Sequence, residues 1–198
     1  MFKSIKHAMM GLGLAVGLSA VATAGEAPDF ALTDVQGKEV KLADYKDKVV
    51  VLEWINFNCP FVKKHYSKNS MPALQEKYTA KDVVWLCINS GPEKPKAGSF
   101  GPEEMAKMAE KNGSKAAHIL LDRDGSVGKA YGAKTTPHMV VINKGDIVYE
   151  GAIDSIASAD TADLEKADNY VVAALDAVLA GEKVSKTKTK GYGCSVKY

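Results

Sequence analysis

The residues best suited to chemistry in this 198-residue chain are Cys59 and Pro60, which come shortly after the apolar run of residues 49–52. A strand that ends before a cysteine, with a helix beginning behind it, places the sulfur at the helix N-terminus. The partial positive charge and unpaired N–H groups there favour the thiolate, which is the nucleophilic form. A buried, inert cysteine is the alternative. The neighbouring Lys63 and Lys64 favour a reactive thiolate, so Cys59 is predicted to be the nucleophile of a thiol-redox protein.

The two other cysteines lie in different surroundings. Cys87 falls inside an apolar run and is predicted to pack in the core, where burial raises a thiol pKa and removes access. Cys194 lies four residues before the C-terminus in a glycine-containing tail, and could fold back to resolve oxidised Cys59. A free or intermolecular Cys194 thiol is the alternative. The odd count of three cysteines requires at least one unpaired thiol.

Three histidines and one acidic residue are further candidates. His65 follows Cys59 by nearly two helical turns, so a surface or packing role is expected. His138 follows a Thr-Pro pair and either tunes the thiolate or is a strand residue with a satisfied imidazole. His118 is expected to be structural. Glu53 lies in the strand before Cys59 and either relays a proton, if it is buried near Cys59, or faces solvent.

A metal site formed by Cys59, His138 and Cys194 would contain suitable ligand types. No pair of these residues has the spacing typical of metal sites. We therefore expect neither a metal nor another cofactor.

The first 24 residues have the layout of a secretory signal peptide. Lys3 and Lys6 precede an apolar stretch over residues 8–21, and Ala-Thr-Ala follows at 22–24. A membrane anchor is the alternative, but this stretch is shorter than the roughly 20 apolar residues that a span needs. We expect cleavage after Ala24, a periplasmic or otherwise exported mature protein, and no stable membrane anchoring.

The charge of the chain is nearly balanced, with 26 basic and 24 acidic residues. Residues 1–24 hold two lysines and no acidic residue, so the mature chain is formally neutral. A neutral chain lacks the basic excess that attracts phosphate backbones, and no nucleic-acid partner is expected.

Apolar β-branched runs alternate with helically spaced segments along the chain. Strands are predicted at residues 49–57, 82–89 and 119–122 and in a hairpin over 138–151, and helices at 61–77, 102–112, 127–131 and 161–181. Pro72 should kink or break the first helix. This order predicts an α/β fold, a central mixed sheet with helices on both faces, with Cys59 at its ligand-facing edge. Residues 25–181 form one predicted domain, and 182–198 a C-terminal tail.

Several short motifs support a family resemblance. They lie at residues 27–30 (Ala-Pro-Asp-Phe), 37–38 (Gly-Lys), 48–52 (Lys-Val-Val-Val-Leu), 58–60 (Asn-Cys-Pro), 122–125 (Asp-Arg-Asp-Gly), 131–132 (Tyr-Gly), 136–137 (Thr-Pro) and 141–143 (Val-Ile-Asn). With these motifs the chain resembles the thioredoxin-like superfamily, and more closely its redoxin branch of alkyl-hydroperoxide-reductase-like and peroxiredoxin-like proteins. The ending Gly-Cys-Ser-Val-Lys-Tyr is similar to an exported peroxiredoxin-like subgroup.

The resemblance implies a thioredoxin-like fold and a cis peptide bond between Thr136 and Pro137, facing Cys59. In this superfamily that turn offers backbone groups to a bound thiol-bearing chain. The chain also departs from the family pattern. Val62 stands where a dithiol protein has its second cysteine, and Asn56 and Leu52 replace the usual Thr or Ser and the Pro of a peroxiredoxin.

Two further departures concern peroxide and copper chemistry. Peroxiredoxins use an arginine near the thiolate, whereas Arg123, the sole arginine of the sequence, lies in a predicted loop. A copper-delivering relative would have a cysteine at position 55, which here is Ile55.

Three functions remain open from the sequence. The first is an exported thiol-disulfide oxidoreductase, in which Cys59 attacks a disulfide or oxidised thiol of a protein or small molecule, Thr136 and Pro137 hold the partner, and Cys194 resolves the mixed disulfide. The second is a peroxiredoxin-like thiol peroxidase that reduces hydroperoxides. Either enzyme needs an electron donor. The third is a non-enzymatic redoxin-fold binding module that has lost turnover.

Overall fold

The computed structural model describes residues 25–95 and 98–198. The predicted signal peptide lies outside these residues, so its cleavage stays a prediction. Within the described part of the chain, no helix has the length and apolar character needed to span a membrane.

A mixed eight-stranded sheet, built from described residues, forms the centre of the molecule, with the strand order β1-β9-β8-β4-β5-β6-β2-β3. Its members are β1 (Gly25–Glu26), β2 (Ala31–Asp34), β3 (Glu39–Lys41), β4 (Val49–Trp54), β5 (Val83–Ser90), β6 (His118–Asp122), β8 (His138–Asn143) and β9 (Asp146–Gly151). Strands β4, β5 and β6 run parallel to one another, and β8 is antiparallel to β4. The predicted α/β, thioredoxin-like architecture is confirmed.

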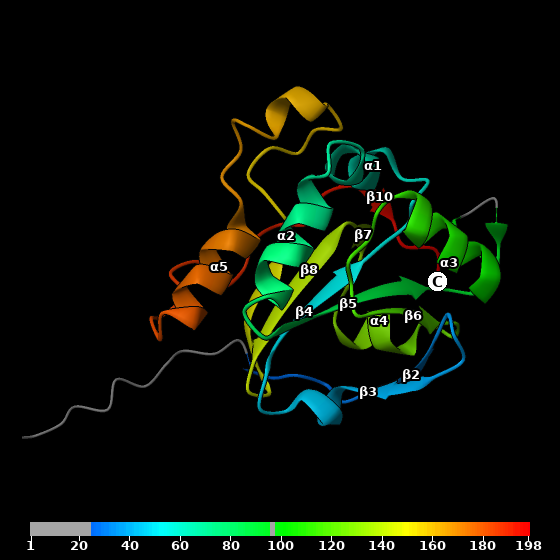
Figure 1. The fold of residues 1–198 in the computed structure, drawn as a ribbon, viewed down its shortest axis with the longest axis horizontal. Coiled ribbons are helices and arrows are strands. Elements are labelled where there is room, and N and C mark those ends of the chain that lie inside the picture. The colour runs from blue at the N-terminus through cyan, green and yellow to red at the C-terminus, as the bar shows by residue number, and fades with distance from the viewer. Residues whose placement is uncertain (1–24, 96–97) are drawn as a thin grey trace, which may run out of the picture.

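Helices cover both faces of this sheet (Figure 1). They are α1 (Pro60–Ser67), α2 (Ser70–Thr79), α3 (Pro102–Lys111), α4 (Ser126–Ala130) and α5 (Tyr170–Leu179), with short 3-10 turns η1 (Leu42–Tyr45) and η3 (Thr161–Asp163). Apolar residues of α1, α2, α3 and α5 share one core cluster, while α4 and the N-terminal segments pack in the other. Successive residues of β4 enter opposite clusters, because side chains alternate along a strand.

Two predicted helices differ from the structure. The helix expected over residues 61–77 is interrupted at Lys68 and Asn69 rather than at Pro72. The backbone of Asn69 is left-handed (φ 56°). Pro72 lies in the first turn of α2, where the missing N–H costs no hydrogen bond.

The helix predicted over residues 161–181 is wrong in its first half. The side chain of Asn169 accepts a hydrogen bond from the Val172 N–H and caps α5, which therefore begins at Tyr170. Residues just before this cap pair instead with the loop after β9, since Ser155 N donates to Asp168 O at 3.0 Å. Apolar spacing alone could not reveal these tertiary bonds.

The tail of residues 182–198 packs across the domain. Val184 is buried in the core cluster that also contains residues of α5, and the tail then meets the edge of β9. There Glu150 N donates to Thr187 O (2.9 Å) and Thr189 N donates to Glu150 O (3.0 Å). It then forms β10 (Cys194–Ser195), which pairs with β7 (Thr135–Thr136) in a separate two-stranded sheet. Figure 1 shows this red segment beside β7 and α1. The tail thus reaches the part of the fold that carries Cys59.

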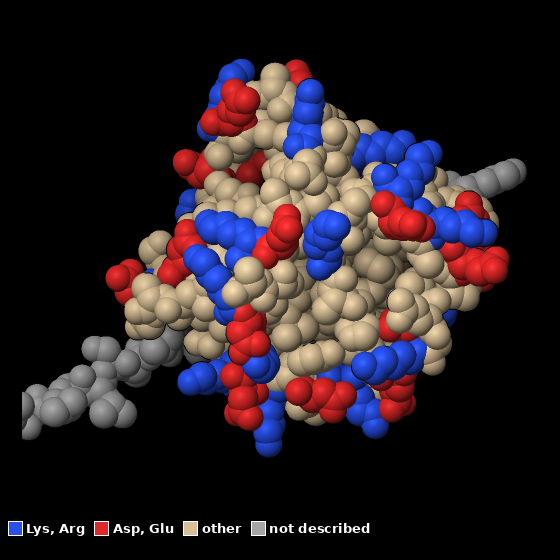
Figure 2. Space-filling view, viewed as in Figure 1, with Lys and Arg blue, Asp and Glu red and all other residues tan. Residues whose placement is uncertain are grey.

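The surface carries both charge signs. On the face drawn in Figure 2, Lys and Arg side chains alternate with Asp and Glu, and neither sign gathers in a stripe. This mixture agrees with the near-equal numbers of basic and acidic residues in the sequence.

Candidate active site

Cys59 occupies the N-cap position of α1, directly after the β4 strand and its short extension. Its backbone is extended (φ −68°, ψ 125°), and Pro60 is the first helical residue, as the sequence predicted. The side chain is only 2% exposed. The Cys59 thiol donates a hydrogen bond to the carbonyl oxygen of Thr136 at 3.1 Å.

The turn that faces Cys59 contains the cis peptide bond between Thr136 and Pro137, which the resemblance implied. Thr136 lies in β7, and its antiparallel partner in β10 is Cys194. The Thr136 hydroxyl donates to the Cys194 carbonyl (3.4 Å), and Val196 N donates to Lys134 O (3.0 Å). The structure therefore brings together all four predicted site residues, Cys59, Thr136, Pro137 and Cys194.

The two cysteines are free thiols with opposite pKa shifts. Burial raises the pKa of Cys59, but the Cys194 thiol, the Thr136 side chain and the backbone amides of Val62 and Cys194 stabilise the thiolate, and the net effect lowers the pKa. Burial and the neighbouring Cys59 raise the pKa of Cys194 to about 11, against a small opposing effect of Lys197. Cys59 is therefore the more acidic thiol of the pair, and Cys194 is the less acidic one.

Glu53 is fully buried, so the alternative that it faces solvent is wrong. Its carboxylate accepts hydrogen bonds from Trp85 Nε1 (2.8 Å), Tyr66 Oη (3.0 Å), Gln75 Nε2 (3.1 Å) and the Cys87 thiol (3.4 Å). Burial raises the pKa of Glu53, although these four donors oppose the rise. Of the three cysteines, the one that bonds to Glu53 is therefore Cys87.

Cys87 lies within the core, as predicted. It is fully buried in β5, and burial together with Glu53 raises its pKa well above the usual value. Its thiol is therefore protonated and inaccessible, as expected of a core cysteine.

The histidines take packing roles. His65 and His138 are buried, and burial lowers the pKa of each to about 4. The His138 ring packs edge-on against Trp54, with centroids 5.6 Å apart, and its Nε2 has no hydrogen-bond partner within the described structure. His118 Nδ1 lies 2.8 Å from Asp34 Oδ2, as expected of a structural residue.

Arg123 contacts the loop of residues 98–100. Its guanidinium donates to Asn89 Oδ1 (3.4 Å) and to the carbonyl of Phe100. Neither contact reaches Cys59, and we find no arginine in the position that polarises peroxide.

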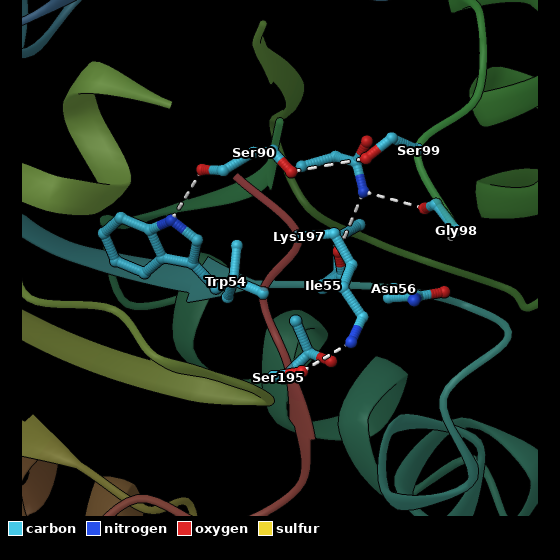
Figure 3. A pocket seen from close by; sticks show the side chains of 11 residues that line it. Trp54, Ile55, Asn56, Ser90, Gly98, Ser99, Ser195 and Lys197 are labelled. Atoms are coloured by element: carbon cyan, nitrogen blue, oxygen red, sulfur yellow. Dashed lines mark hydrogen bonds between the residues drawn. The ribbon is translucent and has the colours of Figure 1, made fainter. Parts of the chain in front are cut away.

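A narrow pocket lies beside the site, between the C-terminal ends of β4 and β5 and the tail (Figure 3). Trp54 Nε1 donates to Ser90 Oγ (3.0 Å) on one wall, and Ser195 and Lys197 of the tail form another. Thr136 also lines it. The tail therefore closes part of the surface next to the candidate nucleophile.

Sequence reasoning missed the contacts that hold the tail. Tyr192 Oη donates to Asp154 Oδ1, and Asp154 Oδ2 lies 3.2 Å from Nζ of Lys64, whose side chain is fully buried. The Tyr192 ring also packs against Phe61 of α1, with centroids 5.8 Å apart. The sole sequence signal was the set of aromatic and glycine residues around Cys194.

No group of three or more His, Cys, Asp or Glu side chains that could hold a metal ion occurs in residues 25–95 and 98–198.

Comparison with known proteins assigns the family. Residues 23–150 match the model of the AhpC/TSA family. The chain belongs to the AhpC/TSA family. Its similarity to a curated relative, the thiol-disulfide oxidoreductase ResA of Geobacillus thermodenitrificans (strain NG80-2), is 33% identity over 129 residues, covering 64% of this chain and 66% of the relative. The match thus spans slightly less than two thirds of the relative's length.

Matches to solved structures cover a larger share of this AhpC/TSA chain than the match to ResA does. An uncharacterized conserved protein from Geobacillus kaustophilus is 31% identical with a TM-score of 0.74, covering 94% of this chain and 98% of that chain. A putative thiol:disulfide interchange protein DsbE from Chlorobium tepidum is 25% identical with a TM-score of 0.54, covering 79% and 99%.

Proposed function

We propose that this protein is an exported thiol-disulfide oxidoreductase in which Cys59 is the nucleophile and Cys194 the resolving thiol. One observation carries the proposal: β10 holds Cys194 opposite Thr136, where its thiol interacts with Cys59 and lowers the pKa of that residue. The similarity to thiol-disulfide oxidoreductases supports the reaction class.

The reaction consists of two thiol-disulfide exchanges. The Cys59 thiolate attacks one sulfur of a substrate disulfide, so the Cys59–substrate bond forms, the substrate S–S bond breaks, and one substrate thiolate leaves. Cys194 then loses its proton and attacks Cys59 Sγ, which forms the Cys59–Cys194 disulfide and releases the second substrate thiolate. Two electrons pass from the protein to the substrate, and protons are taken up by the two leaving thiolates.

The cycle closes with a dithiol electron donor, which reduces the Cys59–Cys194 disulfide by the same exchange. The steps are reversible, so the relative reduction potentials of substrate and donor set their direction. The Thr136–Pro137 turn, against which Cys59 lies, holds the substrate chain in this proposal.

Export is part of the proposal because residues 1–24 have the signal-peptide layout. The mass of the mature protein recovered from an exported fraction tests it: a chain beginning at Gly25 supports cleavage after Ala24, and a full-length cytoplasmic chain contradicts it.

A thiol peroxidase is the second candidate, supported by the redoxin family and by a second thiol beside Cys59. Cys59 would take one oxygen of a hydroperoxide, releasing an alcohol or water and forming a sulfenic acid. Condensation with the Cys194 thiol would release water and form the disulfide. Arg123 donates hydrogen bonds to Asn89 and Phe100, and this weighs against efficient peroxide cleavage.

The test compares disulfide exchange with peroxide reduction by the reduced protein, followed by mass spectrometry. We expect rapid exchange with hydroxyethyl disulfide, loss of exchange in Cys59→Ser, and arrest at a Cys59 mixed disulfide in Cys194→Ala. Cys87→Ala is the matched control, since it removes a thiol that takes no part. A hydrogen peroxide rate far above that of free cysteine would favour the peroxidase.

A Cys59→Ser protein that kept full biological activity would instead indicate the third function, a binding module without turnover. Exchange in vitro that survives Cys59→Ser would contradict the oxidoreductase directly.

A further inference from the structure

The segment of residues 193–198, here called the terminal hexapeptide, is bound to the domain as a separate peptide would be. Cys194 pairs with Thr136, Ser195 with Thr135, and Val196 N donates to Lys134 O at 3.0 Å. These are backbone contacts, which any extended segment can make. Within the described chain, β10 is the strand partner of β7. This position therefore accommodates one strand at a time.

Close packing restricts the residue before the cysteine. A Cβ atom on Gly193 would lie 2.1 Å from the Thr136 carbonyl oxygen, and the backbone there has a positive φ of 127°. The strand can approach the Thr136–Pro137 turn because this position has no side chain.

The last residue of the chain enters a second recognition element. The Tyr198 ring lies over Gly125 and Gly128, where added Cβ atoms would fall 2.5 Å from Cδ1 and 2.4 Å from Oη. The Tyr198 hydroxyl donates to the carbonyl of Ala133, and Lys129 Nζ lies 5.4 Å from the ring centroid. We call the surface of Gly125, Gly128 and Ala133 the aromatic slot. It exists because two glycines leave room for a ring.

The terminal hexapeptide and the tail residues before it are held by different kinds of contact, backbone pairing and one ring for the hexapeptide and side-chain bonds for the residues upstream. Tyr198 remains 41% exposed. Upstream, by contrast, Thr189 Oγ1 accepts from Ala152 N (2.9 Å), and Tyr192 donates to buried Asp154. The hexapeptide can therefore leave the groove while residues 187–192 stay in place.

The geometry points to a peptide-binding groove under the terminal hexapeptide, with the chain's own end acting as an internal substitute for substrate. The groove takes an extended protein segment with a small residue before its cysteine and an aromatic residue four positions after it. This inference rests on the proposed function, because a substrate cysteine must reach Cys59, where Cys194 now lies. Cys59 is 2% exposed with the hexapeptide bound, so substrate entry requires that it leave.

One consequence concerns product release. Substrate and hexapeptide compete for the same strand position on β7, so the return of Cys194 to attack the mixed disulfide also displaces the substrate strand. Resolution and release thus become one event, in which the Cys59–Cys194 bond forms as the Cys59–substrate bond breaks.

The test measures disulfide exchange between two synthetic peptides and the reduced Tyr198→Ala, Cys194→Ala protein, in which the slot is empty and resolution is blocked. Both peptides have the sequence Tyr-Gly-Cys-Ser-Val-Lys-X with the cysteine as a mixed disulfide with thionitrobenzoate, and X is Tyr or Ala. We expect the Tyr peptide to react with Cys59 at least about tenfold faster, a ratio equal to about 1.4 kcal/mol. Equal rates would overturn the groove.

Two controls separate the groove from the chemistry. Hydroxyethyl disulfide has no peptide strand and no aromatic ring. It should react at the same rate with the Tyr198→Ala, Cys194→Ala protein and with the same protein carrying Gly128→Ala, and its failure to react would refute the proposed function rather than the groove. Gly128→Ala, added to the same protein, should abolish the preference for Tyr because its methyl group fills the slot. If that variant does not fold, the comparison of the two peptides alone decides the matter.

Discussion

Cys194 faces Thr136 across a two-residue antiparallel pairing, so a residue near the C-terminus is held at the cis-proline turn beside Cys59. The pKa of Cys59 therefore depends on the presence of Cys194.

Replacing Cys194 by Ala should raise the pKa of Cys59. Burial alone raises it, and the Cys194 thiol is the strongest of the contacts that lower it. A thiol reacts with iodoacetamide as the thiolate, so the alkylation rate rises with pH through the pKa. We expect the curve of Cys59 alkylation rate against pH to be shifted to higher pH in Cys194→Ala, relative to the unmodified protein. Identical curves would show that Cys194 does not stabilise the thiolate.

Gly193→Ala should expose Cys59 by forcing β10 away from Thr136. The added methyl group meets the Thr136 carbonyl, and a side chain at positive φ costs about 1–2 kcal/mol. Because 1.4 kcal/mol is a factor of ten in an equilibrium, alkylation of Cys59 should accelerate about tenfold. Formation of the Cys59–Cys194 disulfide should slow in proportion.

Gly181→Ala is the matched control for that change. Gly181 also has a positive φ (72°), but a Cβ there would meet no atom within 4 Å. It shares the backbone strain without the clash, so Cys59 alkylation should keep its original rate. Acceleration in both variants would mean that general destabilisation exposes the thiol.

Glu53→Gln should remove a pH dependence of stability. The folded-state pKa of Glu53 is raised by burial, so between the unfolded pKa, about 4.5, and the folded pKa the native state binds more protons than the unfolded state. The free energy of unfolding contributed by this group therefore falls as pH increases through that window. The difference between wild type and Glu53→Gln, measured by urea unfolding from pH 4 upward, should decrease with pH. A pH-independent difference would contradict the raised pKa.

Asp154→Asn should destabilise the fold strongly. It leaves the fully buried Lys64 ammonium, which lies 3.2 Å from Asp154 Oδ2, without its counter-charge. Removing one partner of a buried pair costs about 3–5 kcal/mol. The double variant Lys64→Met, Asp154→Asn should recover most of this loss, because no buried charge is left. Urea unfolding measures both, and an equal loss in the two variants would argue against an unpaired charge.

The sequence determined the parts of the site that depend on local order. Cys59 follows a strand built from β-branched residues and precedes a proline that begins a helix, so its place at the N-terminus of α1 could be predicted. The buried position of Cys87 and the hairpin of β8 and β9 follow equally from apolar runs and turn residues. Each of these features is set by neighbours within a few residues.

Tertiary structure decided the rest, because the deciding contacts join residues far apart in the chain. β4 is apolar on both faces, so its pattern could not tell that Glu53 points at Trp85 and Cys87. Apolar spacing also placed the start of α5 too early, because Asn169 caps the helix and the residues before this cap bond to the loop after β9. Cys194 reaches Cys59 because the tail is fastened to Asp154 and to Thr136, and such pairings bring no local signal.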